Sequence, residues 1–155
     1  MINNPISIRT ANLDDLETLL QFEQGVIAFE RPLDSFLADG DLCYYNIPQL
    51  ITSKKSHLIV GVLNNELVAS GYIRIEDSKE YHKNPKHGYI GFIFVKPAFR
   101  GQRISSLILE SLKDWAKEKD LKELRLDLYS NNVGAIKAYE RFGLIKSLVN
   151  MRMDI

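Results

Sequence analysis

The sequence has few of the residues on which several common chemistries depend. Its 155 residues include one cysteine, Cys43, and three histidines, His57, His82 and His87. A single cysteine cannot form an internal disulfide, and histidines spaced this widely do not form the ligand cluster of a zinc site. We therefore expect no bound metal, and we expect Cys43 to be a small buried residue.

An excess of one charge and long apolar runs are also missing. Twenty basic residues balance twenty acidic ones, whereas nucleic-acid binding needs a basic excess to release counterions. No apolar run approaches the roughly 18 residues of a transmembrane helix, and the first residues lack a signal-peptide pattern. We expect no nucleic-acid or membrane partner and a cytoplasmic protein. Because no linker or repeat interrupts the sequence, we also expect one domain over residues 1–155.

The order of apolar patterns predicts an α/β protein with a mixed sheet and helices on both faces. Alternating or continuous apolar stretches indicate strands at residues 6–9, 57–63, 67–75, 89–95, 124–128 and 145–154. A capping box at Asn12 and Asp15 opens a first helix. Helical spacing indicates further helices at residues 33–38, 47–52, 102–119 and 133–142. Asn64 and Asn65 predict a tight hairpin, since both tolerate left-handed conformations.

One junction between a buried strand and a helix has the features of an anion site. The strand ends at Val95, and Arg100, Gly101 and Arg103 lie in the loop that follows. A helix N-terminus leaves N–H groups unpaired and carries partial positive charge, to which arginines add full charges. Such loops are also ordinary connections, so a phosphate site and a plain turn are both open. No Walker sequence and no G-x-G-x-x-G motif occurs.

The sequence resembles the GNAT superfamily of acyl-CoA-dependent N-acetyltransferases over nearly its full length. The family signature V-x-P followed by R/Q-x-x-G-x-G/A is matched at Val95, Pro97 and Arg100. A second pattern, N-x-x-A-x-x-x-Y-x-x-x-G-F, is matched by Asn132, Ala135, Tyr139, Gly143 and Leu144. The chain departs from the signature at Arg103 and Ser105, where the family has small residues that let the pyrophosphate approach. The Arg103 side chain could point away, contact a CoA phosphate or block binding.

The resemblance implies a role for each matching residue. Backbone groups of Ile93, Phe94 and Val95 would hold the pantetheine arm of acetyl-CoA and polarise the thioester carbonyl. The pyrophosphate would lie on Arg100, Gly101, Gln102, Arg103, Ile104, Ser105 and Ser106. Asn132 would contact the CoA arm, cap the following helix, or do both. Tyr139 would protonate the leaving thiolate as general acid, its alternative role being that of a core tyrosine.

Several groups could deprotonate the acceptor amine. No carboxylate lies on the central strand around Gly91. Asp127 matches the position of the base in relatives that acetylate protein N-termini, although a lone strand aspartate can equally be structural. Glu30, His87 and ordered water are the alternatives.

The resemblance therefore implies transfer of an acetyl group from acetyl-CoA to a primary amine in a ternary complex. The alternative is a non-catalytic domain of the same fold that binds acyl-CoA as a sensor or interaction module. Residues 1–50 hold eight acids and two bases, whereas residues 96–146 hold eleven bases and seven acids. In the layout that the resemblance implies, the acidic region would lie on the acceptor side and the basic region would hold the CoA phosphates, so we expect a cationic acceptor. Tyr44 and Tyr45 could line the acceptor pocket, and a homodimer is compatible with the family.

Overall fold

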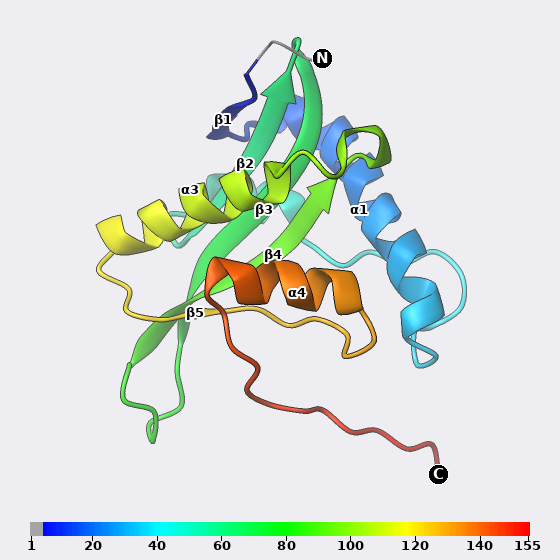
Figure 1. Ribbon diagram of the computed structural model, residues 1–155, viewed down its shortest axis with the longest axis vertical. Helices are drawn as coiled ribbons and strands as arrows, with labels where there is room; N and C mark the ends of the chain where they lie inside the picture. Colours follow the sequence, from blue (N-terminus) through cyan, green and yellow to red (C-terminus); the bar gives the residue numbers. More distant parts are fainter. Residues whose placement is uncertain (1–4) are drawn as a thin grey trace.

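A computed structural model describes residues 5–155 as a five-stranded sheet with helices on both faces (Figure 1). The strands are β1 (Ser7–Thr10), β2 (Ser56–Leu63), β3 (Glu66–Asp77), β4 (Lys86–Val95) and β5 (Leu124–Arg125). They lie in chain order across the sheet, and neighbouring strands are antiparallel except for the parallel pair β4 and β5. The predicted α/β class with a mixed sheet is confirmed.

Four α-helices cover the sheet. They are α1 (Leu16–Glu30), α2 (Ile47–Thr52), α3 (Ile104–Glu118) and α4 (Val133–Phe142). On one face, Leu19 and Phe22 of α1 pack with Ile47 of α2 in one apolar cluster. The apolar stripe of α3 packs in a second cluster, to which α4 adds Tyr139 and Phe142. Among residues 5–155, no helix is both long enough and apolar enough to cross a membrane.

Local hydrogen bonds set the helix ends as the sequence predicts. The Asp15 carboxylate accepts from the Asn12 N–H at 2.9 Å, and the Asn12 side chain accepts from the Asp14 N–H at 2.9 Å. This capping box holds a short 3-10 turn, after which α1 begins. At the other end of the chain, Gly143 adopts φ 117° and ends α4.

A bulge bends β4, the strand next to the edge strand β5. Phe92 has φ 55°, and the register between β3 and β4 shifts between Ser70 and Tyr72. The buried Ser70 hydroxyl donates to the Phe92 carbonyl at 2.9 Å and so holds this irregular backbone. Because a bulge bends its strand and increases the local twist, the second half of β4 takes a different direction from the first.

The bend is followed by a divergence of β4 and β5. The two strands pair only at Gly88 with Leu124 and at Tyr89 with Arg125. In the part of the chain that the structure describes, no ladder joins residues 90–95 to residues 126–131. The strand predicted at 124–128 therefore ends at Arg125, because residues 126–128 no longer pair with β4. An open edge of β4 results beyond Tyr89.

Two predicted elements are wrong. The helix expected at 33–38 is replaced by a 3-10 turn at Arg31–Leu33, after which Asp34 accepts a hydrogen bond from the Phe36 N–H at 2.9 Å. The strand expected at 145–154 is extended but pairs with no strand of residues 5–155, because the chain leaves the sheet after Gly143 (Figure 1).

Candidate active site

The predicted pyrophosphate segment lies where β4 ends and α3 begins. A 3-10 turn at Pro97–Phe99 and a left-handed Gly101, with φ 80°, reverse the chain after Val95. The N–H groups of the first turn of α3 have no acceptor within the helix and lie at the positive end of its dipole. Ser105 and Ser106 belong to this turn, and Ser106 is exposed. The segment can therefore bind an anion through its backbone.

Two arginines in this segment have different environments. Arg100 donates from Nε to the Val95 carbonyl at 3.1 Å and ties the loop to β4. Arg103 immediately precedes α3 with φ 62° and ψ 23°, a left-handed conformation that costs a non-glycine residue roughly 1–2 kcal/mol. This is the position where the family signature has glycine. The Arg103 side chain is exposed and makes no capping hydrogen bond, so it extends from the loop into solvent.

Asn132 immediately precedes α4, and Tyr139 lies in the second half of this helix. The Asn132 side chain accepts from the Ala135 N–H at 3.3 Å, which confirms its role as the N-cap. Tyr139 is half-buried against the α3 side of the core. Burial, with a smaller contribution from the Glu30 carboxylate, raises the pKa of Tyr139 to about 12. Its hydroxyl therefore keeps its proton at neutral pH.

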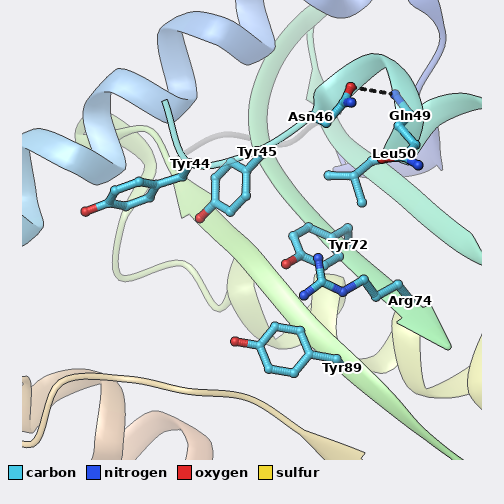
Figure 2. A pocket seen from close by; sticks show the side chains of 8 residues that line it. All are labelled: Tyr44, Tyr45, Asn46, Gln49, Leu50, Tyr72, Arg74 and Tyr89. Atoms are coloured by element: carbon cyan, nitrogen blue, oxygen red, sulfur yellow. Dashed lines mark hydrogen bonds between the residues drawn. The ribbon is translucent and has the colours of Figure 1, made fainter. Parts of the chain in front are cut away.

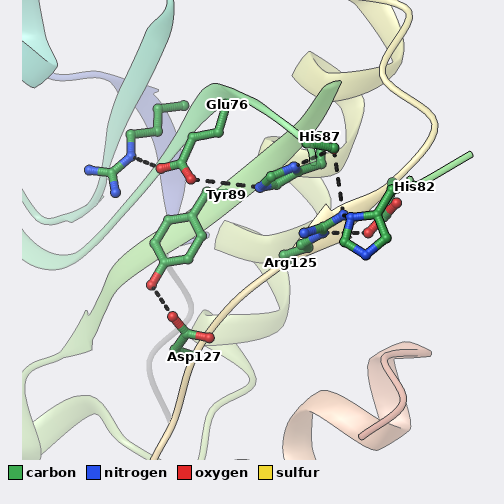
Figure 3. A network of polar contacts seen from close by, with 9 residues as sticks. Glu76, His82, His87, Tyr89, Arg125 and Asp127 are labelled. Atoms are coloured by element: carbon green, nitrogen blue, oxygen red, sulfur yellow. Dashed lines mark hydrogen bonds and ion pairs between the residues drawn. The ribbon is translucent and has the colours of Figure 1, made fainter. Parts of the chain in front are cut away.

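Asp127 lies on the segment that diverges from β4 (Figure 3). It is exposed, and its Oδ2 accepts from the Tyr89 hydroxyl of β4 at 2.9 Å. Burial and this hydrogen bond raise the pKa of Tyr89. Asp127 therefore spans the start of the opening between the two strands, with its second oxygen available for another donor.

His87 lies at the same end of β4 as Tyr89, and Glu76 contacts both His87 and the Arg74 side chain that packs on Tyr89. The His87 ring is buried, with Nδ1 2.9 Å from the Ser78 hydroxyl and Nε2 3.6 Å from Glu76 (Figure 3). Burial, and secondarily the nearby Arg125, lower the pKa of His87. The geometry thus places His87 among structural contacts and away from the open part of β4.

A buried carboxylate positions the segment between α1 and α2. Glu23 of α1 accepts at Oε2 from the N–H groups of Tyr44 and Tyr45, at 3.0 and 2.8 Å. Burial raises the pKa of Tyr44 to about 12, and Glu30 contributes to the same shift. The preceding residue, Cys43, is exposed, which corrects the expectation that it is buried.

These tyrosines line a pocket of about 330 Å³ over β3 and β4 (Figure 2). Its wall consists of Tyr44, Tyr45, Asn46, Gln49, Leu50, Tyr72, Arg74 and Tyr89. The Arg74 guanidinium lies 5.5 Å from the centre of the Tyr72 ring and 4.9 Å from that of Tyr89, and it pairs with Glu76. A Cβ at Gly91 would lie 2.5 Å from the Tyr72 hydroxyl, so this position of β4 has no room for a carboxylate.

Sequence reasoning found Tyr44 and Tyr45 but missed the rest of this wall. The sequence does indicate that Tyr72 and Arg74 lie together, because residues two apart on a strand share a face. Arg74 is also directly opposite Tyr89 in the antiparallel register. The pairing of β3 with β4 was therefore needed to place the three side chains together.

The family assignment follows from comparison with known proteins. The model of the acetyltransferase (GNAT) family matches residues 16–144. This chain belongs to the GNAT family. A Bacillus subtilis protein, provisionally named a ribosomal protein bS18-alanine N-acetyltransferase, is 25% identical to it over 145 residues, which cover 89% of this chain and 80% of that protein.

Solved structures show the same GNAT fold. A point mutant of the BH1408 protein from Bacillus halodurans superimposes with a TM-score of 0.87 and 21% identity, covering 96% of this chain and 99% of that one. A predicted acetyltransferase from Clostridium acetobutylicum, crystallised with acetyl-CoA, gives a TM-score of 0.73 and 18% identity, covering 97% and 96% of the two chains. The sheet and its flanking helices are therefore those of GNAT acetyltransferases.

Proposed function

We propose that this GNAT protein transfers the acetyl group of acetyl-CoA to a primary amine, and specifically to the α-amino group of a peptide or protein. The observation that supports this best is the open edge of β4 beyond Tyr89, which has the anion-binding start of α3 at one end. In this proposal residues 1–155 act as one domain in the cytoplasm, and no metal takes part.

Acetyl-CoA fits this edge as a substrate. Its pyrophosphate would lie on the backbone of residues 100–106, and its pantetheine arm would pair with Ile93, Phe94 and Val95 in place of the missing β5 ladder. Asn132 would contact the arm through a group that its capping bond leaves available. The thioester carbonyl would accept from a β4 N–H, which stabilises the negative charge that develops on its oxygen.

The reaction then needs one proton acceptor and one proton donor. The amine nitrogen attacks the thioester carbon, the carbon–sulfur bond breaks, and Tyr139 gives its proton to the leaving sulfur. A hydroxyl with a pKa of about 12 is protonated before the step and can protonate a thiolate, whose conjugate acid is much more acidic. We assign the base to Asp127, which already accepts from Tyr89 at the start of the opening. Glu30, whose carboxylate influences Tyr139, is the second candidate.

The pocket favours an acceptor with an amine next to a polar backbone group. An ammonium would face Asp127 and Tyr89, and a carbonyl oxygen behind it would face Arg74, which lies between Tyr72 and Tyr89. An α-amino group followed by a peptide carbonyl has this chemistry. The name of the Bacillus subtilis relative, which refers to a protein alanine, agrees with it.

A thiol-release assay with acetyl-CoA tests this proposal against the non-catalytic alternative. The acceptors would be a short peptide with a free N-terminus, the same peptide N-terminally blocked but containing lysine, spermidine and an aminoglycoside. We expect release with the free N-terminus and much less with the blocked peptide. Saturable acetyl-CoA binding without thiol release for any amine would refute the catalytic function.

Variants of the same assay test the assigned roles. Tyr139→Phe removes one hydroxyl and should lower kcat by about 10²–10⁴-fold, the usual contribution of a general acid. Asp127→Asn should lower kcat, because the amide cannot accept the proton of the attacking amine. Tyr81→Phe is the matched control, since Tyr81 is exposed on the loop after β3, and its kcat should equal that of the wild type.

A further inference from the structure

Glu76 contacts the charged side chain of the pocket over β3 and β4. Of the eight residues that line this pocket, Arg74 alone carries a charge at neutral pH. Arg74 and Glu76 are two positions apart on β3 and therefore share a face of the sheet. Arg74 donates from Nε to Oε2 of Glu76, while its guanidinium lies over the rings of Tyr72 and Tyr89 (Figure 2). A substrate oxygen that binds Arg74 thus meets a guanidinium whose charge is already paired.

A second contact fixes the Glu76 carboxylate from the other side. Its Oε1 lies 3.6 Å from Nε2 of the buried His87, which is opposite Glu76 in the antiparallel register (Figure 3). The Ser78 hydroxyl holds the same ring, at 2.9 Å from Nδ1. Because burial lowers the pKa of His87, the ring is uncharged above about pH 7, and the negative charge of Glu76 acts on Arg74. The sheet itself therefore fixes the ion pair.

The ion pair matters more for the pocket than for the fold. The Arg74 and Glu76 side chains are 44% and 33% exposed, and ion pairs this exposed add little to stability. In the pocket, however, the pair offsets the positive charge of the guanidinium. A guanidinium has five N–H donors, so the bond at Nε leaves donors at the Nη atoms for a carbonyl oxygen. A substrate carboxylate would instead bring a second negative charge next to Glu76, and the two would repel each other.

We propose that Glu76 sets the acceptor class of this site by restricting Arg74 to a neutral carbonyl, so that the amine of a peptide is selected over that of a free amino acid. This role of Glu76 rests on the proposed function, because it requires an acceptor in the pocket with its carbonyl on Arg74. Glu76 does not touch the acceptor in this arrangement. It acts through Arg74, and it gives the pocket a repulsive element next to an attractive one, which is how binding sites reject a close analogue.

Alaninamide and alanine test this selectivity, because they have the same amine and methyl group and differ in an amide against a carboxylate. The thiol-release assay gives the ratio of their kcat/KM values for each variant. The wild type should favour alaninamide. Glu76→Gln keeps the size of the side chain and an oxygen for Arg74, and it should move the ratio towards alanine by about tenfold, as the loss of one nearby charge allows.

Asp77→Asn is the matched control for the lost charge. Asp77 is the next residue of β3, its side chain is exposed, and it pairs with Lys86. This variant should keep the wild-type ratio. A double-mutant cycle then tests the route: in an Arg74→Gln background, Glu76→Gln should no longer change the ratio. A ratio that is unchanged by Glu76→Gln alone, or that changes equally in both backgrounds, would overturn the proposal.

Binding measured without turnover separates the role of Glu76 from the proposed catalysis. In the presence of CoA, which has no acetyl group to transfer, the protein is titrated with alaninamide and with alanine. The NMR signals of the Tyr72 and Tyr89 backbone give a dissociation constant for each. Glu76→Gln should move the ratio of the constants towards alanine, and Asp77→Asn should not. If this shift occurs without thiol release from acetyl-CoA, catalysis fails while the role of Glu76 stands. Binding of neither probe, or an unchanged ratio, would refute that role.

Discussion

Arg103 allows a quantitative test, because its strained backbone should lower the stability of the protein whereas its side chain should strengthen acetyl-CoA binding. Its φ of 62° costs roughly 1–2 kcal/mol for a residue with a Cβ. Arg103→Gly removes that cost, but glycine loses more conformational freedom on folding, and this lowers the free energy of unfolding by about 0.5–1 kcal/mol. The net gain in the free energy of unfolding is therefore about 0.5–1 kcal/mol. For a chain of this length we expect the Tm to rise by about 1–4 °C.

The same substitution should weaken acetyl-CoA binding. Arg103 immediately precedes α3 and its side chain is exposed, so it can add a charge-assisted bond to a CoA phosphate at the start of this helix. The net value of such a bond is about 1.5–3 kcal/mol, so a partly solvated one corresponds to about a tenfold rise in Kd. Arg103→Gly is thus expected to be more stable and to bind less tightly.

Differential scanning calorimetry and isothermal titration with acetyl-CoA measure the two effects. Arg103→Lys keeps the charge and the left-handed backbone, so its Tm should equal that of the wild type. Arg100→Gly is the second control: position 100 is extended, with φ −69°, and this variant loses the bond to Val95, so its Tm should fall. An unchanged Tm for Arg103→Gly would refute the strain argument, and tighter binding would show that the side chain obstructs the phosphate.

Two further predictions concern β3 and β4. Because burial lowers the folded-state pKa of His87, the unfolded chain binds the proton more readily, and stability is lost as pH falls below about 6.5 towards the lowered value. The free energy of unfolding, measured with urea, should therefore fall less between pH 7.5 and pH 5 for His87→Gln than for the wild type. An equal fall for both proteins would contradict this. Ser70→Ala removes the donor to the Phe92 carbonyl and should cost about 1–3 kcal/mol in the same assay, with a higher KM for acetyl-CoA. A variant with wild-type stability and KM would show that the bulge does not depend on this bond.

Short-range signals in the sequence predicted the fold well. Asn64 and Asn65 adopt φ 51° and 63° in the turn between β2 and β3, as their tolerance of left-handed backbone led us to expect. The capping box at Asn12 and the stop at Gly143 are also present. Each of these features depends on residues within a few positions of one another, so the local sequence contains the necessary information.

Features that depend on distant segments could not be predicted in this way. The apolar residues at 145–154 predicted a strand, but a local pattern does not say whether another strand will lie beside it, and the segment forms no strand in the structure. The bulge at Phe92 also has no local signature, because its positive φ is held by Ser70, 22 residues earlier in the sequence. The pocket over β3 and β4 also could not be predicted locally, because it depends on the register that places Arg74 opposite Tyr89.

The structure reduces the number of acidic residues that support the prediction of a cationic acceptor. Of the acids in residues 1–50, Asp15 pairs with Arg9, Asp34 binds Tyr129 and Arg152, and Glu23 accepts from backbone N–H groups. These carboxylates are committed to the fold, so their number says little about the acceptor. Glu30 and Asp127 remain close to the proposed reaction, whereas the pocket itself contains the cation Arg74. A single ammonium followed by a carbonyl matches this mixed environment better than a polyamine, whose remote positive charges would approach Arg74.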